Sequence, residues 1–152
     1  MIHDLATRLL HGLDPETAHR LGIQGLKLGL GPRQFSRDPD ILHTRLAGLD
    51  LPNPVGLAAG FDKNAETPDA LLAAGFGFVE CGAVTPRAQD GKPKPRIFRL
   101  EEDRAVINRM GFPNQGLDLF KARLARRSGR KGVVGVNLGA NLDSEDRVPD
   151  YV

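Results

Sequence analysis

The chain has 152 residues, of which 40% are hydrophobic and 26% charged, a balance typical of one soluble globular domain with a hydrophobic core. Its formal net charge of +2 is too small to indicate a nucleic-acid-binding protein, and its single cysteine excludes a disulfide within the chain. No signal peptide and no apolar stretch of membrane-spanning length is visible, so we expect a reducing, cytoplasmic setting that is compatible with contact to a membrane surface.

Residues 1–32 are predicted to form two short helices. Apolar residues recur at helical spacing from Ile2 to Leu13, and Asp14-Pro15-Glu16 is typical of a helix start, with a side-chain cap, a proline in the first turn and an acid near the positive end of the dipole. Gly29 to Pro32 ends the second helix. The pattern alone favours a helical pair packed on its own domain. The alternative is an amphipathic pair that rests on a lipid surface or frames an apolar tunnel.

Short apolar strands alternate with helices in the rest of the chain. A polar connector over residues 33–44 leads into a short hairpin around Gly48. The later predicted elements are, in order, a strand at 55–59, a helix at 66–74, a strand at 75–85, a loop at 86–95, an antiparallel pair at 96–100 and 105–110, a helix at 114–127, a strand at 131–141, and a helix capped by Asp143 or Ser144. This βαβαβ order predicts a parallel α/β sheet or barrel. Because the chain stops just inside a predicted helix, we expect an N-terminal piece of a longer protein.

Small and polar residues follow all three apolar strands, in Ala59–Lys63, Gly82–Pro86 and Asn137–Asn141. Carboxyl ends of parallel strands meet at one edge of a sheet, so these residues are expected to gather there. Taken singly, each has an ordinary structural explanation: Gly60 as a turn glycine, Lys63 as a solvated residue paired with Asp62, and Asn137 as a loop cap. Taken together, they favour a ligand site at that edge.

The segment from Ile107 to Gly116 contains polar residues within an apolar context. Its structural interpretation is a helix cap at Asn114, and its functional interpretation is a loop that folds over a ligand, with Asn108 as a hydrogen-bonding group. The usual phosphate-binding glycine motifs are absent, and the histidines are too scattered to suggest a metal site. Cys81 lies in an apolar run and is expected to be a buried, unreactive thiol.

Four stretches resemble the quinone-dependent (class 2) dihydroorotate dehydrogenases: NPVGLAAGFDKNAE, GFGFVECGAVTPRAQDGKPKPRIFRL, AVINRMGFPNQG and GVVGVNLGAN. LDPETAHRL near the N-terminus is similar to the helical extension of that family. The resemblance covers nearly the whole chain, in order and at the family's spacing. The extension distinguishes class 2 from class 1 relatives.

The resemblance implies an α/β fold, the N-terminal part of a (β/α)8 TIM barrel preceded by a small helical domain. Residues 1–32 would form the helical membrane and quinone-tunnel domain, 33–44 the connector, and 45–152 the first part of the FMN-binding barrel. The implied flavin-contacting residues are Ala59, Gly60, Phe61, Asp62, Lys63, Ala83 and Asn137. The implied substrate-contacting residues are Lys63, Asn108, Arg109, Met110, Gly111 and Phe112. His19 and Arg99 match positions near the quinone tunnel, and we expect Asp62 to hold Lys63 in place.

The implied activity is oxidation of dihydroorotate to orotate in pyrimidine biosynthesis, with FMN as the carrier and a membrane quinone as the acceptor. The implied location is the cytoplasmic face of the cell membrane, with peripheral contact through residues 1–32. The family's catalytic serine lies in a later strand loop, so the 152-residue chain alone is expected to be inactive. The alternatives are another FMN barrel oxidoreductase, such as a class 1 enzyme or a dihydrouridine synthase, and a non-catalytic fragment that binds membrane surfaces.

Two positions depart from the family pattern. Ala83 stands where a flavin-contacting threonine or serine is usual, and Ala140 stands where many members have lysine. Any flavin contact at Ala83 would therefore use the backbone or packing alone. Both positions are peripheral to the reacting atoms.

Overall fold

The computed structural model describes the backbone of residues 2–152 and the side chains of residues 7–152. Two helices come first, α1 (Ile2–His11) and α2 (Pro15–Lys27). The predicted helix start is confirmed, because the Asp14 carboxylate accepts a 2.9 Å hydrogen bond from the Thr17 N–H and Pro15 occupies the first turn. Met1 and the apolar side chains of residues 2–6 lie outside the described part.

The connector contains one 3₁₀ turn, η1 (Asp40–Leu42), and is followed by an antiparallel hairpin of β1 (Thr44–Leu46) and β2 (Leu49–Leu51). Ala47 and Gly48 both have positive φ in the hairpin turn, at 48° and 82°. This pair is the backbone geometry that matches the twist of two strands joined by a two-residue loop. The predicted turn at Gly48 is therefore confirmed.

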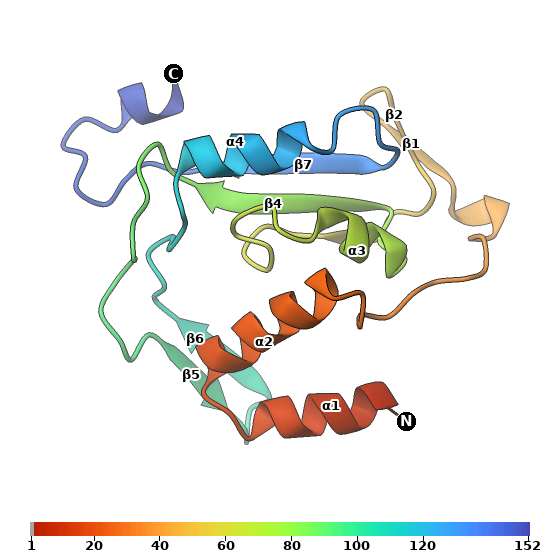
Figure 1. The fold of residues 1–152 in the computed structure, drawn as a ribbon, viewed down its shortest axis with the longest axis horizontal. Helices are drawn as coiled ribbons and strands as arrows, with labels where there is room; N and C mark the ends of the chain where they lie inside the picture. Colours follow the sequence, from red (N-terminus) through yellow and green to blue (C-terminus); the bar gives the residue numbers. More distant parts are fainter. Residues whose placement is uncertain (1) are drawn as a thin grey trace.

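A three-stranded parallel sheet in the order β3-β4-β7 forms the centre of the structure. Its strands are β3 (Gly56–Leu57), β4 (Phe78–Val84) and β7 (Val133–Leu138). Helix α3 (Pro68–Ala73) connects β3 to β4, and α4 (Leu117–Ala125) lies between β4 and β7 in the chain. The predicted βαβαβ order is confirmed. Among the described residues the sheet is open, and its three strands do not close into a barrel (Figure 1).

The strand predicted over 55–59 is shorter than expected. Only Gly56 and Leu57 pair regularly with β4. Beyond them the chain bends at Gly60, whose φ is +110°, and single hydrogen bonds replace the ladder: Gly60 N–H donates to Gly82 O at 2.8 Å, and Gly82 N–H donates to Asp62 O at 2.9 Å. Residues 58–62 therefore remain attached to β4 while leaving the strand conformation.

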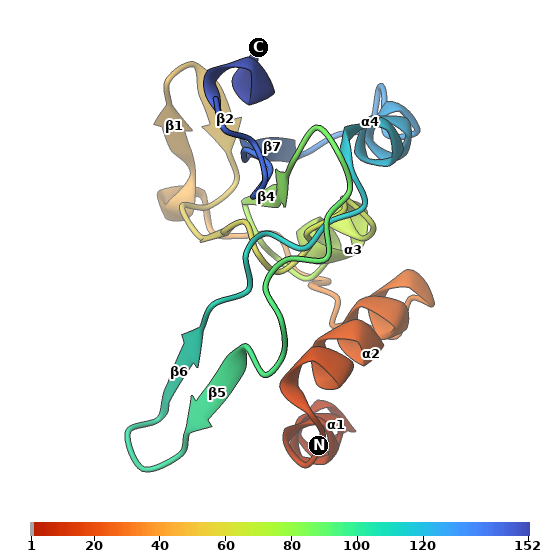
Figure 2. The same cartoon turned by 90° about the vertical axis from the view of Figure 1, so that its left-hand side faces the viewer.

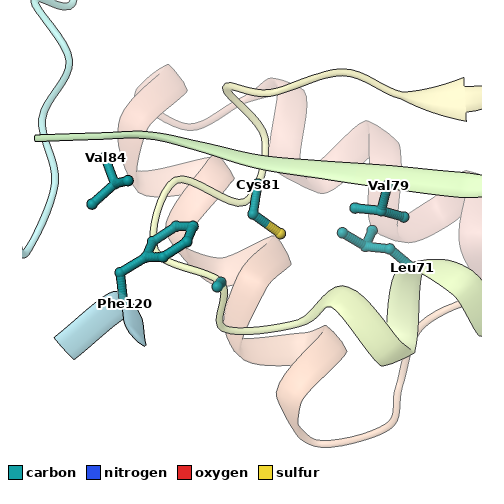
Figure 3. Close-up of a cluster of buried hydrophobic side chains, with 6 residues drawn as sticks. Leu71, Val79, Cys81, Val84 and Phe120 are labelled. Carbon is teal, nitrogen blue, oxygen red and sulfur yellow. The ribbon is translucent and has the colours of Figure 1, made fainter. Parts of the chain in front are cut away.

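The hydrophobic core lies between the sheet and the helices α3 and α4 (Figure 3). Leu71 of α3, Phe120 of α4 and the β4 residues Val79, Cys81 and Val84 pack together there, each at most 4% exposed. Burial, reinforced by the nearby Asp62, raises the pKa of the Cys81 thiol to about 12. The predicted burial of Cys81 is confirmed, and its low reactivity stays a prediction.

A second hairpin, β5 (Ile97–Leu100) with β6 (Ala105–Asn108), lies apart from the sheet. Both views place this hairpin beside the α1–α2 pair, on the opposite side of the structure from the β1–β2 hairpin and the C-terminus (Figures 1 and 2). The antiparallel pair predicted at 96–110 is confirmed.

Two predicted helix starts are wrong. The α-helix expected after Asp143 or Ser144 is absent from the described chain, which forms only a 3₁₀ turn, η2 (Val148–Tyr151). The Asp150 carboxylate is bonded instead to Ser144 Oγ, at 2.7 Å, and to the Asn141 N–H, at 2.8 Å, which holds residues 141–150 in a closed loop. Asn114 does not cap α4, whose N-cap is Gly116.

Candidate functional site

A cavity of about 1200 Å³ lies where the strand ends, the helix α2 and the β5–β6 hairpin meet. Helix α2 contributes five residues to the wall, and most of the others come from the ends of β3, β4, β6 and β7 and the segments that follow them. This volume exceeds the few hundred Å³ of an ordinary small-ligand pocket. The cavity is therefore large enough for two ring systems.

Every residue predicted to contact flavin or substrate lines this cavity, although the segments that carry these residues are up to 78 positions apart in the chain. These residues are Ala59, Gly60, Phe61, Asp62, Lys63, Ala83, Asn108, Arg109, Met110, Gly111, Phe112 and Asn137. His19 also lines the cavity. Arg99 lies elsewhere: its guanidinium donates to the carbonyl oxygens of His11 and Leu13, at 2.7 and 2.9 Å, and ties the α1–α2 connection to β5. The chemical roles of all these residues stay predictions.

The Lys63 ammonium lies half-buried in the wall and donates a 2.6 Å hydrogen bond to Gly60 O. Burial lowers the pKa of Lys63, the Arg96 charge acts in the same direction, and the carboxylates of Glu16 and Asp62 oppose the shift. The alternative in which Lys63 pairs with Asp62 is wrong, because the Asp62 carboxylate is directed into the turn that follows it and the residue is only 1% exposed. The Asp62 carboxylate is therefore bonded within the turn and not to Lys63.

His19 joins α2 to the same strand end. Its Nε2 lies 2.7 Å from Phe61 O, and its ring meets the Phe61 ring edge-on, with centroids 5.4 Å apart. Because a carbonyl oxygen only accepts, Nε2 carries the hydrogen and Nδ1 remains an acceptor. Burial and the neighbouring Lys63 charge lower the pKa of His19, so the imidazole is neutral at pH 7.

The segment after β6 is held against the wall by backbone and amide contacts. The Arg109 guanidinium donates to Pro95 O at 3.1 Å, and Gln89 Nε2 donates to the carbonyl oxygens of Gly111 and Phe112, both at 3.1 Å. Asn108 is exposed, and its Oδ1 accepts a 3.4 Å hydrogen bond from the Met110 N–H. Asn108 and Phe112 thus line the cavity from a backbone that hydrogen bonds hold in place.

Buried Asn114 supports this segment from behind. Its Nδ2 donates to Thr85 Oγ1 and to Phe112 O, both at 2.8 Å, and its Oδ1 accepts the N–H groups of Thr85 and Gly116. The asparagine therefore joins the end of β4 to the loop before α4. This is a structural role different from the predicted helix cap.

The lining fits a planar flavin ring. Gly60 and Ala59 put no bulk over the strand end, and a Cβ atom placed on Gly60 would meet nothing within 4 Å, so the space beside it is open. The Asn137 amide stands nearby and donates to Glu80 Oε1 at 3.2 Å. Ala83 is 8% exposed and brings only a methyl group, consistent with a packing contact. The residues that would hold the ring are thus present at one edge.

An ion pair that the sequence did not reveal joins α2 to the residue just before β5 in the cavity wall. Arg96 donates from Nε and Nη2 to the two carboxylate oxygens of Glu16, both at 2.8 Å, and from Nη1 to the carbonyl oxygens of Asp90 and Lys92. The hydrogen bond from Arg96 lowers the pKa of Glu16 to about 2. The partners are 80 residues apart, so no local spacing signals the pair. The sequence identified Glu16 only as an acid at a helix start.

Comparisons with known proteins agree with the geometry. A family model described as dihydroorotate dehydrogenase matches residues 41–152. The protein named dihydroorotate dehydrogenase (quinone) from Erythrobacter litoralis is 57% identical over 152 residues, covering 99% of this chain and 44% of that relative. Its namesake from Rhodopseudomonas palustris is 63% identical over 148 residues, covering 97% of this chain and 40% of the relative.

A solved structure has the same fold. The crystal structure of DHODH in complex with ferulenol from Eimeria tenella superposes with a TM-score of 0.84 at 44% identity, covering 94% of this chain and 42% of that one. The ligand-free form from the same organism also gives a TM-score of 0.84. The chain spans about two fifths of the length of the relatives that it matches.

Proposed function

The chain belongs to the dihydroorotate dehydrogenase family, and we propose that it supplies the helical part and the first barrel strands of an enzyme that oxidises dihydroorotate to orotate with a quinone as acceptor. The observation that carries this proposal is the single cavity that gathers the strand-end residues, Asn108 to Phe112 and His19. The proposed cofactor is FMN. When bound, FMN would supply a two-electron carrier between the substrate and the quinone.

In this proposal the Lys63 ammonium supplies positive charge beside the flavin ring and the substrate carboxylate. Lys63 is half-buried, so its charge interactions are stronger than they would be in bulk solvent. The Lys63 ammonium donates a 2.6 Å hydrogen bond to the Gly60 carbonyl oxygen, which fixes it beside the end of β3. Asn108 offers an amide that both donates and accepts, as the edge of a pyrimidine ring requires.

His19 and the helical pair are proposed to form the quinone side. The neutral imidazole lines the cavity and is anchored through Nε2, which leaves Nδ1 free to act as an acceptor. Arg99 fixes the α1–α2 connection to β5 and so sets the separation of the helices from the hairpin. In this proposal both residues fix the position of the helical pair, and so the width of the quinone tunnel between that pair and the barrel.

Peripheral contact of residues 1–32 with the cytoplasmic face of the cell membrane is part of the proposal. Large apolar side chains of this region face solvent, among them Leu9, Leu21, Leu28 and Leu30, each at least half exposed. Within the described residues, no helix combines the length and apolarity needed to cross a bilayer. Co-sedimentation with anionic vesicles tests this part. Binding that survives Leu28→Ser together with Leu30→Ser would contradict it.

A chimera tests the enzymatic proposal. This chain would replace the matching segment of the Rhodopseudomonas palustris relative, to which it is 63% identical. We expect the chimera to form orotate from dihydroorotate with a quinone acceptor, and Lys63→Met to lower the rate by at least about a hundredfold. Lys121→Met, on the exposed surface of α4, is the matched control. A folded chimera without activity, or an active Lys63→Met chimera, would refute the proposal.

The 152-residue chain by itself is expected to form no orotate. Its sheet has three strands, and on the edge strand β7 the side chains of Val136 and Leu138 are 40% and 52% exposed. A barrel interior shielded from water needs a closed sheet. Orotate formation by the purified chain would contradict this expectation.

A further inference from the structure

The carboxylate of Asp62 is buried and is surrounded by hydrogen-bond donors of the turn that follows it. Its Oδ1 accepts the N–H groups of Glu66, at 2.8 Å, and Asn64, at 3.3 Å. Its Oδ2 accepts the Thr67 N–H at 2.7 Å and the Thr67 hydroxyl at 3.3 Å, with Cys81 Sγ 3.8 Å away. One side chain thus binds three residues of the loop over residues 62–67. The ligand chemistry proposed above makes no use of this group.

The backbone that precedes Lys63 in the chain is attached to the sheet. Gly82 N–H donates to Asp62 O, and Gly60 N–H donates to Gly82 O. Lys63 therefore lies between a segment fixed to β4 and a turn fixed by the Asp62 carboxylate. Its ammonium reaches back to Gly60 O rather than to a carboxylate partner on Asp62.

The outer side of the same loop is held by cations from two helices. Lys27 of α2 lies 2.8 Å from the Glu66 carboxylate, and Arg123 of α4 donates to Asn64 O at 3.1 Å. These contacts are at least partly exposed, and exposed ion pairs contribute little. The buried Asp62 bonds are the stronger restraint, because hydrogen bonds to a charged group in a site without water are both shorter and stronger.

We propose that Asp62 is a positioning residue for Lys63, which fixes the turn over residues 62–67 and thereby sets where the ammonium projects into the cavity. The consequence for catalysis rests on the proposed function, because that function assigns the Lys63 charge to the flavin ring and the substrate carboxylate. The positioning itself is a property of the unliganded chain.

The test follows the titration of Lys63 by NMR of ¹³C-labelled lysine side chains in the full chain, with Lys63→Arg identifying its signal among the six lysines. Loss of a nearby negative charge by itself lowers the pKa of an ammonium group. Release of the turn exposes the ammonium to water and raises its pKa. The direction of the change in Asp62→Asn therefore separates positioning from simple electrostatics.

We expect Asp62→Asn to raise the pKa of Lys63 toward the ordinary lysine value of about 10.4. The matched control is Asp69→Asn, which removes one carboxylate that binds Arg127 and Arg130 and leaves the turn amides untouched. It is expected not to raise the pKa of Lys63. A pKa that is unchanged or lower in folded Asp62→Asn would overturn the proposal, and so would an equal rise in both variants.

If Asp62→Asn does not fold, hydrogen exchange in the unmutated chain tests whether the Asp62 carboxylate fixes the turn. We expect the amide hydrogens of Glu66 and Thr67 to exchange at least about a hundredfold more slowly than in an unstructured peptide. Faster exchange would overturn the proposal. Neither measurement needs flavin or orotate. An inactive chimera would therefore refute the proposed function without affecting this inference.

Discussion

Replacing Glu16 by glutamine removes the charge that binds Arg96. The Arg96 side chain is only 9% exposed, and Glu16 15%. Removing one partner of a fully buried ion pair costs about 3–5 kcal/mol. Here Arg96 keeps its bonds to two carbonyl oxygens and glutamine can still accept one hydrogen bond, so we expect a loss of about 2–3 kcal/mol. For a chain of this size that corresponds to a fall in Tm of roughly 5–10 °C.

The same ion pair predicts a pH dependence. The pKa of Glu16 is lowered from its ordinary value of 4.5 to about 2, so its stabilisation is fully present above pH 4.5 and is lost as the pH falls through 2. The difference in pKa corresponds to about 3 kcal/mol, and solvent screening at this partly exposed site reduces it to on the order of 1–2 kcal/mol. The difference in stability between wild type and Glu16→Gln should therefore shrink as the pH is lowered from 5 toward 2.

Thermal unfolding of both proteins between pH 2 and pH 8 measures this effect. Glu102→Gln is the control, because it makes the same charge change at an exposed position of the turn between β5 and β6. It should lower Tm by less than about 2 °C, as surface substitutions usually do. Equal Tm values for wild type and Glu16→Gln at pH 7, or a difference that persists unchanged at pH 2, would refute the reasoning.

Three further predictions concern the core and its polar support. Cys81 should resist alkylation by iodoacetamide in the native chain up to pH 9 and react readily in denaturant, because its pKa is raised to about 12; mass spectrometry of both samples checks this. Phe120→Ala should destabilise the fold by about 3–5 kcal/mol in urea unfolding, since it opens a cavity beside β4, whereas a loss below about 1 kcal/mol would contradict the packing described. Asn114→Ala should cost about 2–4 kcal/mol, because the buried N–H groups of Thr85 and Gly116 lose their acceptor. Asn114→Asp, which keeps the acceptor, should recover part of that loss.

Several local features followed directly from neighbouring residues. The start of α2 depends on Asp14, Pro15 and Glu16, which lie within one turn of the helix they begin. The turn at Ala47-Gly48 and the buried position of Cys81 also depend on a few adjacent residues. These features can be predicted from sequence because the interacting residues are close neighbours in the chain. Placement of the strand-end residues at one edge needed only the βαβ rule of parallel sheets in addition.

Other features could not be predicted because they depend on atoms brought together by the whole fold. Asp62 and Lys63 are adjacent in the sequence, which suggested an ion pair. In the structure the Asp62 carboxylate instead accepts the N–H groups of Glu66 and Thr67, because several buried donors of the turn surround it. Asn114 looked like a helix cap, whereas the end of β4 supplied a donor and an acceptor at better positions. A local pattern shows which bonds a residue can make, and the fold selects among them.

By itself, the sequence determined the helix start, the βαβαβ order, the family and the set of residues expected around one ligand site. The tertiary structure alone decided that Glu16 meets Arg96 across 80 residues, that Arg99 lies on the helical connection and outside the cavity wall, and that Asp62 serves a turn. The physical reason is the distance in sequence between the interacting residues. Helix caps and turns are contacts between near neighbours, whereas a buried ion pair forms only where packing has already excluded water and brought both partners into position.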